Sequence, residues 1–222
     1  MPSYQIPLQI KLNDSATFEN FQSEANEQLV SILQSGEPFV YYWSTESFGK
    51  SHLAQAVCQN QANSFYLSMT ELNQWQPDIF EGLESFDLIS LDDIQFLAGQ
   101  ADWEQALFNL FNRVRDSGKR LRVSANTSPN NLGIQLKDLL SRLTWGVTQQ
   151  LLPISDEAKV RALSERAKQR GFSLSDDVAN YLLKHCPRDM KSLFAILDKL
   201  DNASLQAQRK ITIPFIKQSL NL

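Results

Sequence analysis

The chain is poor in the features that mark secreted, disulfide-bonded and membrane-spanning proteins. Only 2 of its 222 residues are cysteines, Cys58 and Cys186. Both lie in apolar, helix-like stretches, so we expect reduced core thiols rather than a disulfide or a metal site. No apolar run approaches the ~20 residues that cross a bilayer, and the N-terminus lacks the basic and apolar regions of a secretion signal. These absences predict a cytoplasmic protein without a membrane partner.

Positive charge is scarce in the first two thirds of the sequence. Residues 1–154 carry 9 Lys and Arg against 17 Asp and Glu, a net charge of −8, whereas residues 155–222 carry 12 against 8, a net charge of +4. Because an acidic surface repels the phosphate backbone, we expect no strong direct binding to DNA. The basic remainder could face a triphosphate, an acidic partner or nucleic acid, although such charges are most often a solvated helical surface.

Apolar, strand-like runs alternate with helix-like stretches in the larger part of the chain. Between two of these runs, apolar residues recur at three- and four-residue spacing from Trp103 to Val114, which is typical of an amphipathic helix. The alternation predicts an α/β fold with a parallel five-stranded sheet and helices on both faces. The expected strands are 39–43, 64–69, 87–92, 120–125 and 146–153.

After Pro153 the strand pattern stops and only amphipathic stretches follow. Ser155 is suited to cap the first of these helices, and Gly171 is suited to end it. We therefore expect an α/β domain over residues 15–153 and a small all-helical domain over residues 154–222.

The octet STESFGKS, residues 44–51, lies between a predicted strand and a predicted helix. Its last three residues are typical of a phosphate-binding loop, in which a glycine lets backbone N–H groups cradle phosphate, a lysine reaches the β- and γ-phosphates, and a hydroxyl holds Mg²⁺. Ser44 and Ser47 stand where such loops favour glycine. If either position needed a left-handed backbone, a serine would cost about 1–2 kcal/mol. An ordinary strand–turn–helix connection is the alternative.

The third predicted strand ends in two carboxylates, Asp92 and Asp93. The first can hold Mg²⁺ through water, and the second can polarise an attacking water. Alternatively, both simply begin a loop and cap a helix. Asn126 follows the fourth strand, where it could contact a γ-phosphate or serve in a turn.

Two arginines suit phosphate chemistry. Arg142 precedes the fifth predicted strand, and arginine can neutralise the charge of phosphoryl transfer within a subunit or across a subunit boundary. Arg188 stands at a helix start, where a cation opposes the helix dipole. We expect its partner to be a nucleotide phosphate or an acid such as Asp189. A surface salt bridge is the alternative for Arg142.

In this order, the motifs resemble the AAA+ family and, within it, the DnaA/Hda group of replication proteins. The resemblance covers nearly the whole chain and rests on the phosphate loop and the segments LISLDDIQFLAG, SAN, LLSRLTWG and PRDMKSLF, followed by a helical lid. It implies an AAA+ P-loop fold that binds ADP, ATP or another nucleoside diphosphate together with Mg²⁺. The segment TFENF and the following Asn26 resemble the part of this group that lies along adenine.

The resemblance assigns a role to each matching residue. Arg142 is implied as a catalytic arginine finger that acts in trans, with Asp93 as the second catalytic residue. Ser51 and Asp92 are implied to hold Mg²⁺. His52 suggests packing when taken alone, yet it falls within the implied nucleotide site. The residues implied to bind nucleotide are Phe18, Phe21, Asn26, Ser47, Phe48, Gly49, Lys50, Ser51, His52, Asn126 and Arg188.

The first 14 residues resemble, at Gln5, Ile6, Leu8 and Ile10, the short peptides that bind the bacterial DNA polymerase III sliding clamp, its β subunit. The same alternation of apolar residues is typical of an edge strand, which is the alternative. The resemblance implies a flexible clamp-binding segment over residues 1–14.

The resemblance also implies a negative regulator of replication initiation. Together with the DNA-loaded clamp, such a protein stimulates hydrolysis of the ATP held by DnaA and leaves inactive ADP-bound DnaA. Its own ATPase would be weak at most, so the chain would not itself be an enzyme, and it could form a homodimer or a larger oligomer. Two alternatives stay open: an ATPase whose Arg142 serves neighbours in a ring, and an adaptor that loads or bridges replication proteins or binds DNA directly.

Overall fold

The computed structural model describes residues 16–220. The predictions for Gln5, Ile6, Leu8 and Ile10 lie outside the described residues. Within them, no helix combines the length and the apolar character that a membrane span requires.

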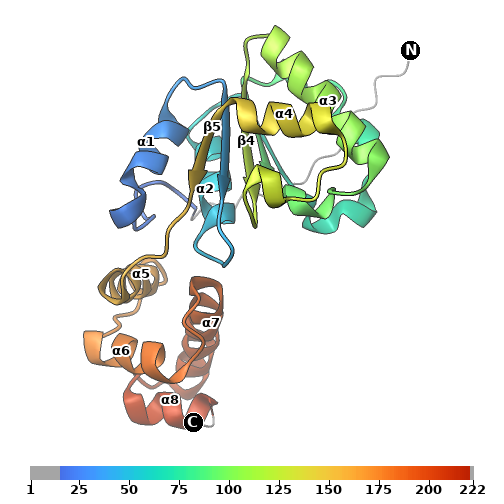
Figure 1. Cartoon of the computed structure of the whole chain (residues 1–222). Helices are drawn as coiled ribbons and strands as arrows, with labels where there is room; N and C mark the ends of the chain where they lie inside the picture. Colours follow the sequence, from blue (N-terminus) through green and yellow to red (C-terminus); the bar gives the residue numbers. More distant parts are fainter. Residues whose placement is uncertain (1–15, 221–222) are drawn as a thin grey trace.

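A five-stranded, all-parallel sheet forms the centre of the α/β part (Figure 1). The strand order is β2-β3-β4-β1-β5, and every neighbouring pair is parallel. All five predicted strands are confirmed: β1 (Phe39–Trp43), β2 (Ser64–Ser68), β3 (Leu88–Asp92), β4 (Arg120–Ala125) and β5 (Val147–Gln150). The fifth strand is shorter than predicted because the Leu152 N–H donates to the side chain of Asn26 at 2.8 Å, and Pro153 has no N–H to donate.

Helices cover both faces of the sheet, as the alternating pattern predicts (Figure 1). Side chains alternate between the two faces of a strand. Accordingly, Val40 and Tyr42 of β1 share one core with helices α1 (Glu27–Gln34) and α2 (Lys50–Gln59). Phe39 and Tyr41 share the other core with α3 (Ala101–Asp116) and α4 (Lys137–Trp145). The amphipathic helix expected around residues 103–114 is α3.

Short 3₁₀ helices fill the connections. They are η1 (Glu24–Asn26), η2 (Met69–Gln74), η3 (Pro77–Phe80), η4 (Leu83–Ser85), η5 (Ile94–Phe96) and η6 (Pro129–Asn131). The η5 turn follows the acid pair, and η6 leads towards α4.

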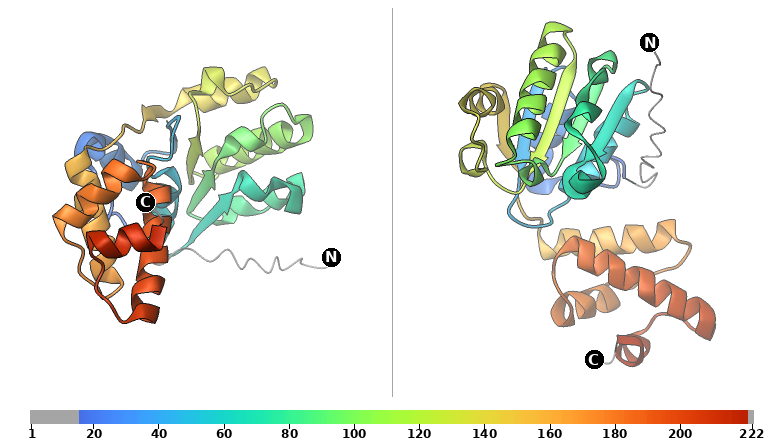
Figure 2. Two further views of the ribbon diagram at one scale, coloured as in Figure 1. Left: turned by 90° about the horizontal axis from the view of Figure 1, so that it is seen from below. Right: turned by 90° about the vertical axis from the view of Figure 1, so that its right-hand side faces the viewer.

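The C-terminal part is helical and has a core of its own (Figures 1 and 2). Ser155 caps the first helix as predicted, since its hydroxyl accepts from the Ala158 N–H at 3.1 Å. Gly171, with φ +87°, follows the end of that helix. The helices are α5 (Asp156–Gln169), α6 (Asp176–His185), α7 (Met190–Ala207) and α8 (Ile213–Leu220).

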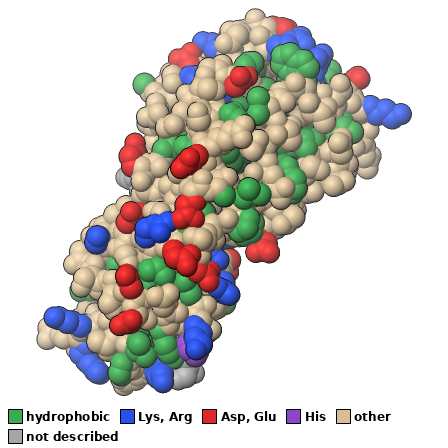
Figure 3. Space-filling model, turned by 60° about the vertical axis from the view of Figure 1, so that its left-hand side comes forward, with side chains coloured by type: hydrophobic (Ala, Val, Ile, Leu, Met, Phe, Trp, Pro, Cys, Tyr) green, Lys and Arg blue, Asp and Glu red, His purple; other side chains and the backbone are tan. Residues whose placement is uncertain are grey.

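Polar contacts fix the segment that connects the α/β part to the helical part, and some of them reach the helical part itself. The amide of Asn26 donates to the Leu152 carbonyl at 3.0 Å and accepts from the Leu152 N–H at 2.8 Å. Glu24 binds both the Ser155 hydroxyl, at 3.0 Å, and the Arg161 guanidinium. On the face shown in Figure 3, acidic and basic side chains gather where the two parts meet. These contacts fix the connecting segment near the carboxyl ends of the strands.

Candidate nucleotide-binding site

The predicted site residues that follow β1, β3 and β4 meet at one edge of the sheet. In parallel strands all carboxyl ends lie at the same edge, which is where α/β sheets bind ligands. Trp43 of β1 aligns with Ala125 of β4, and the next residue, Ser44, donates its N–H to the Ala125 carbonyl at 3.3 Å. The topology therefore places the 44–51 loop, the acid pair and Asn126 beside one another.

Lys50 holds the 44–51 loop together from the first turn of α2. Its Nζ donates to the Ser44 carbonyl at 3.0 Å, to the Ser44 hydroxyl at 3.2 Å and to the Glu46 carbonyl at 3.2 Å. Burial lowers the pKa of Lys50, while Asp93 and Asp92 act to raise it. The ammonium thus lies inside the loop and close to the acid pair, where it can meet a phosphate.

Glycine is strongly favoured at position 49. Its φ is +103°, a conformation that side-chain-bearing residues rarely adopt. A Cβ there would lie 2.9 Å from Cε2 of Phe21. Ser44 and Ser47 carry no such strain, because the non-glycine residues with positive φ among residues 16–220 are Glu24, Asp93 and Gln208. The cost considered for the two serines therefore does not arise.

Asp92 is a buried carboxylate, 1% exposed. It accepts hydrogen bonds from the hydroxyls of Ser124 on β4 and, at 3.2 Å, Tyr66 on β2. Burial raises the pKa of Asp92 and the neighbouring Asp93 adds to this, while the hydroxyls of Ser124, Ser51 and Tyr66 act against it. Ser51 and Asp92, the expected Mg²⁺ residues, are thus close enough for the Ser51 hydroxyl to act on the pKa of Asp92.

Asp93 differs from Asp92 in its backbone conformation and in its hydrogen-bond partners. Its φ of +61° is left-handed, and its N–H donates to the Ser124 hydroxyl at 3.0 Å. Its carboxylate accepts from Nε2 of Gln95 at 3.0 Å, and Oε1 of Gln95 accepts from the Asn126 N–H at 3.1 Å. Gln95 therefore links the acid pair to the exposed Asn126. Sequence patterns did not single out Gln95, Ser124 or Tyr66, because a lone amide or hydroxyl has no spacing that marks a site.

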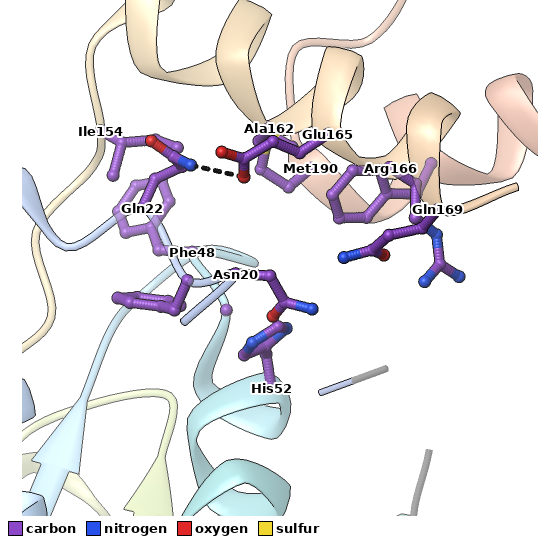
Figure 4. Close-up of a pocket in the computed structure, with 13 residues that line it drawn as sticks. Asn20, Gln22, Phe48, His52, Ile154, Ala162, Glu165, Arg166, Gln169 and Met190 are labelled. Atoms are coloured by element: carbon purple, nitrogen blue, oxygen red, sulfur yellow. Dashed lines mark hydrogen bonds between the residues drawn. The ribbon is translucent and has the colours of Figure 1, made fainter. Parts of the chain in front are cut away.

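A cavity of about 140 Å³ opens between the 44–51 loop, α2 and the helical part (Figure 4). Phe21, Phe48, Gly49 and His52 line it from the α/β side, and α5 and α7 close it from the other. Nε2 of His52 lies 2.7 Å from the Thr17 carbonyl oxygen, and burial lowers the pKa of this histidine. A ring that stays neutral at pH 7 suits a largely apolar cavity.

A second cavity, of about 290 Å³, lies beside the first and shares Phe48. Ser47 borders it on the loop side, and Lys159 and Arg188 border it on the helical side. Arg188 is exposed and forms an ion pair with Asp156. Asp189, the acid expected as an alternative partner, instead caps α7 by accepting from the Ser192 N–H at 2.9 Å.

Five of the expected nucleotide residues line neither cavity: Phe18, Asn26, Lys50, Ser51 and Asn126. Lys50 and Ser51 belong to the 44–51 loop, and Asn126 follows β4. Phe18 packs against the core between α1 and α2, and Asn26 uses both atoms of its amide on the backbone of Leu152. If Phe18 and Asn26 contribute to binding, they do so through the position of the neighbouring segment.

The described residues fit an adenine nucleotide with Mg²⁺. The first cavity offers aromatic surface to a base, and Lys50, Lys159 and Arg188 offer cations to phosphates near the N-terminus of α2. Within residues 16–220 no group of three or more His, Cys, Asp or Glu could hold a metal alone. Magnesium here would therefore bind phosphate oxygens together with the Ser51 hydroxyl, with Asp92 beside it.

Arg142 lies at the other end of the sheet. Its guanidinium carbon is 5.9 Å from the ring centroid of Phe111, and that ring is 4.8 Å from the ring of Phe39, the first residue of β1. The 44–51 loop follows the last residue of this five-residue strand, which rises about 3.3 Å per residue. Arg142 is half-buried, and none of the ion pairs found within residues 16–220 involves it.

Two family models match the chain. The model of the bacterial DnaA ATPase domain matches residues 61–150, and the model of the Hda lid domain matches residues 156–220. An uncharacterised protein of Haemophilus influenzae is 44% identical over 228 residues, which cover 98% of this chain and 99% of that protein.

Solved structures share the fold. Domain III of the replication initiation protein DnaA of Thermotoga maritima is similar with a TM-score of 0.80 and 19% identity, over 95% of this chain and 98% of that one. AMPPCP-bound DnaA from Aquifex aeolicus is similar with a TM-score of 0.64 and 24% identity, over 89% and 69% of the two chains. The predicted AAA+ fold with its helical C-terminal part is confirmed. The chain belongs to the DnaA-related AAA+ proteins, is Hda-like among them, and is a nucleotide-binding regulator of DNA replication.

Proposed function

We propose that this chain inactivates DnaA by promoting hydrolysis of the ATP that DnaA holds. Water attacks the γ-phosphate, inorganic phosphate leaves, and DnaA retains ADP. Arg142 stabilises the charge on the transferred phosphoryl group from outside the DnaA subunit. An arginine supplied in trans can raise such a rate by ~10³–10⁵.

The placement of Arg142 carries this proposal. Arg142 is half-buried. Its guanidinium lies over the ring of Phe111, far from the chain's own phosphate loop at the opposite end of β1. A cation so placed cannot serve the home nucleotide, yet it is available to one held by another subunit. An aromatic ring beneath a guanidinium limits its motion without neutralising its charge, which suits insertion into a partner's active site.

The chain's own nucleotide has a structural role in this proposal. ADP between the 44–51 loop and the helical part would be held by Lys50 and Arg188, and would keep the two parts at one angle. The home site also favours weak ATP turnover at most, because the Asp93 carboxylate accepts from Gln95 and is therefore less available to polarise a water.

The sliding clamp is the second partner that we propose. Gln5, Ile6, Leu8 and Ile10 would bind it as an extended peptide. Three apolar anchors at ~1.5–3 kcal/mol each are set against ordering costs of ~1–2 kcal/mol per residue, so one peptide binds weakly. Several peptide sites on one ring would raise the effective affinity.

Arg142→Ala tests the proposal. We expect this variant to fold, to bind ADP and to bind the clamp, but to lose stimulation of DnaA-bound ATP hydrolysis, measured as phosphate release with DNA-loaded clamp. The matched control is Arg209→Ala, which removes another guanidinium that lies over a phenylalanine ring, 5.7 Å from the centroid of Phe215 in the helical part. The control should stimulate normally.

Two results would contradict this function. Stimulation retained by Arg142→Ala would exclude the arginine finger. Rapid ATP hydrolysis by the purified chain alone, lost in Arg142→Ala, would favour the self-sufficient ATPase ring instead.

A further inference from the structure

Glu104, in the first turn of α3, is a buried carboxylate that the proposed function leaves unused. It is 1% exposed, and none of the ion pairs found in the described part of the chain includes it. Its oxygens accept instead from three backbone N–H groups: Gly99 at 2.7 Å, Gln135 at 3.0 Å and Leu136 at 2.7 Å. Burial of a carboxylate is costly unless its oxygens are satisfied, so this arrangement is specific.

Two of the three donors lie at the start of α4, the helix that carries Arg142. The first N–H groups of a helix have no acceptor within it. Leu136, the N-cap of α4, has no side chain that could accept from them. Glu104 accepts from the N–H of the N-cap residue, Leu136, and from that of Gln135 just before it. Its negative charge also favours the positive end of the α4 dipole.

The third donor, Gly99, lies at the end of the segment that follows Asp92 and Asp93. From Asp93 the chain folds into successive tight turns, in which the Phe96 N–H donates to the Asp93 carbonyl at 3.3 Å and the Leu97 N–H donates to the Ile94 carbonyl at 3.1 Å. Ile94 and Leu97 are fully buried. This compact segment reaches Gly99, so the Glu104 carboxylate joins the acid side of the home nucleotide site to the start of α4.

Leucines of α4 pack into the hydrophobic core and fix the helix against it. Leu139 and Leu143 are at most 1% exposed, whereas Arg142 between them is half-buried and lies over the ring of Phe111. Apolar packing alone leaves the helix free to slide or to unwind at its start. We propose that Glu104 is a positioning residue, which fixes the start of α4 and thereby directs Arg142 towards the nucleotide of the partner subunit. This inference rests on the function proposed for Arg142.

Glu104→Gln is the test, because it keeps the shape of the side chain but removes one acceptor oxygen and the charge. The matched control is Asp102→Asn, an exposed carboxylate in the same turn of α3. Both variants are assayed for stimulation of DnaA-bound ATP hydrolysis over a range of chain concentrations, and for hydrogen–deuterium exchange of the full-length protein.

We expect Glu104→Gln to lower the maximal stimulated rate by roughly 10- to 100-fold, since a small displacement of a catalytic group has effects of this order. The concentration giving half-maximal stimulation should stay the same, because the docking surface is unaltered. Exchange should rise at residues 135–143, while the rest of the sheet core stays protected. Asp102→Asn should change none of these quantities.

Two results would overturn the inference: an unchanged maximal rate, or unchanged exchange at residues 135–143. If Glu104→Gln fails to fold, Leu136→Pro decides instead, because it removes one donor at a position whose φ of −75° already suits proline. A normal maximal rate in Leu136→Pro would then refute the inference. Loss of stimulation in Arg142→Ala but not in Glu104→Gln refutes only this inference, whereas retention in Arg142→Ala refutes the proposed function.

Discussion

At the scale of single residues, the 44–51 loop shows how a serine can replace a glycine. Ser44 is fully buried. Its hydroxyl donates to the Glu46 carbonyl at 2.7 Å and accepts from Nζ of Lys50 at 3.2 Å. Side-chain hydrogen bonds therefore stabilise the loop at position 44. The left-handed backbone that requires glycine occurs at position 49.

Gly49→Ala is expected to weaken nucleotide binding. The left-handed backbone costs about 1–2 kcal/mol for alanine, which corresponds to roughly a 5- to 30-fold lower affinity for ADP. The new Cβ would also displace the ring of Phe21 from the first cavity. Isothermal titration with ADP measures the affinity.

The matched control is Gly36→Ala, where an added Cβ meets nothing within 4 Å. Equal ADP affinity in Gly49→Ala and Gly36→Ala would show that the 44–51 loop does not bind the nucleotide.

At the scale of elements, a buried arginine ends α1. Arg122 on β4 is fully buried, and burial, with a smaller effect of Arg120, lowers its pKa to about 10. Its guanidinium donates to the carbonyls of Glu37 at 2.7 Å, Ser35 at 3.1 Å and Leu33 at 3.4 Å. The last carbonyls of a helix have no partner within it, so Arg122 supplies the donors that α1 needs against the sheet.

Arg122→Met should therefore destabilise the α/β part. The substitution keeps much of the apolar volume but leaves buried carbonyls unpaired, at about 1–3 kcal/mol each. We expect the free energy of unfolding in urea to fall by roughly 3 kcal/mol. Arg120→Met on the same strand removes a half-buried arginine that binds Gln61 at 2.9 Å, and should cost less than ~1 kcal/mol. Equal losses in both variants would contradict the role of Arg122.

At the scale of the whole molecule, the two parts meet around a cleft rather than through a shared core. The helical part packs around its own leucines, and the contacts across the junction are largely polar. Glu24 provides two of them, to Ser155 and Arg161. Asn26 forms two further hydrogen bonds to the backbone of Leu152, just before the helical part and 126 residues away in the sequence. The connecting segment is thus fixed next to the nucleotide cavities.

Asn26→Ala should loosen this junction without unfolding either part. Each lost hydrogen bond contributes about 0.5–1.5 kcal/mol. Since ADP would contact both parts, we expect its affinity to fall roughly 5- to 30-fold and the rise in melting temperature on addition of ADP to become smaller. Thermal unfolding with and without ADP measures both effects.

The control is Asn180→Ala, an exposed asparagine on α6. An ADP-induced shift as large in Asn26→Ala as in Asn180→Ala would mean that the nucleotide does not bridge the two parts.

The sequence by itself determined the sheet, its amphipathic helices and the candidate phosphate loop, because these follow from local periodicity and from residue types at fixed spacing. It also indicated Arg142 and Arg188, through the family resemblance. Only the tertiary structure decided which groups contact and orient the residues of the site. The roles of Gln95, Glu104 and Arg122 could not be predicted from the sequence. Their partners lie far along the chain or are backbone atoms, and a backbone group is the same in every sequence. Long-range packing alone brings a carboxylate of α3 to the start of α4, or an amide of η1 to the segment after β5.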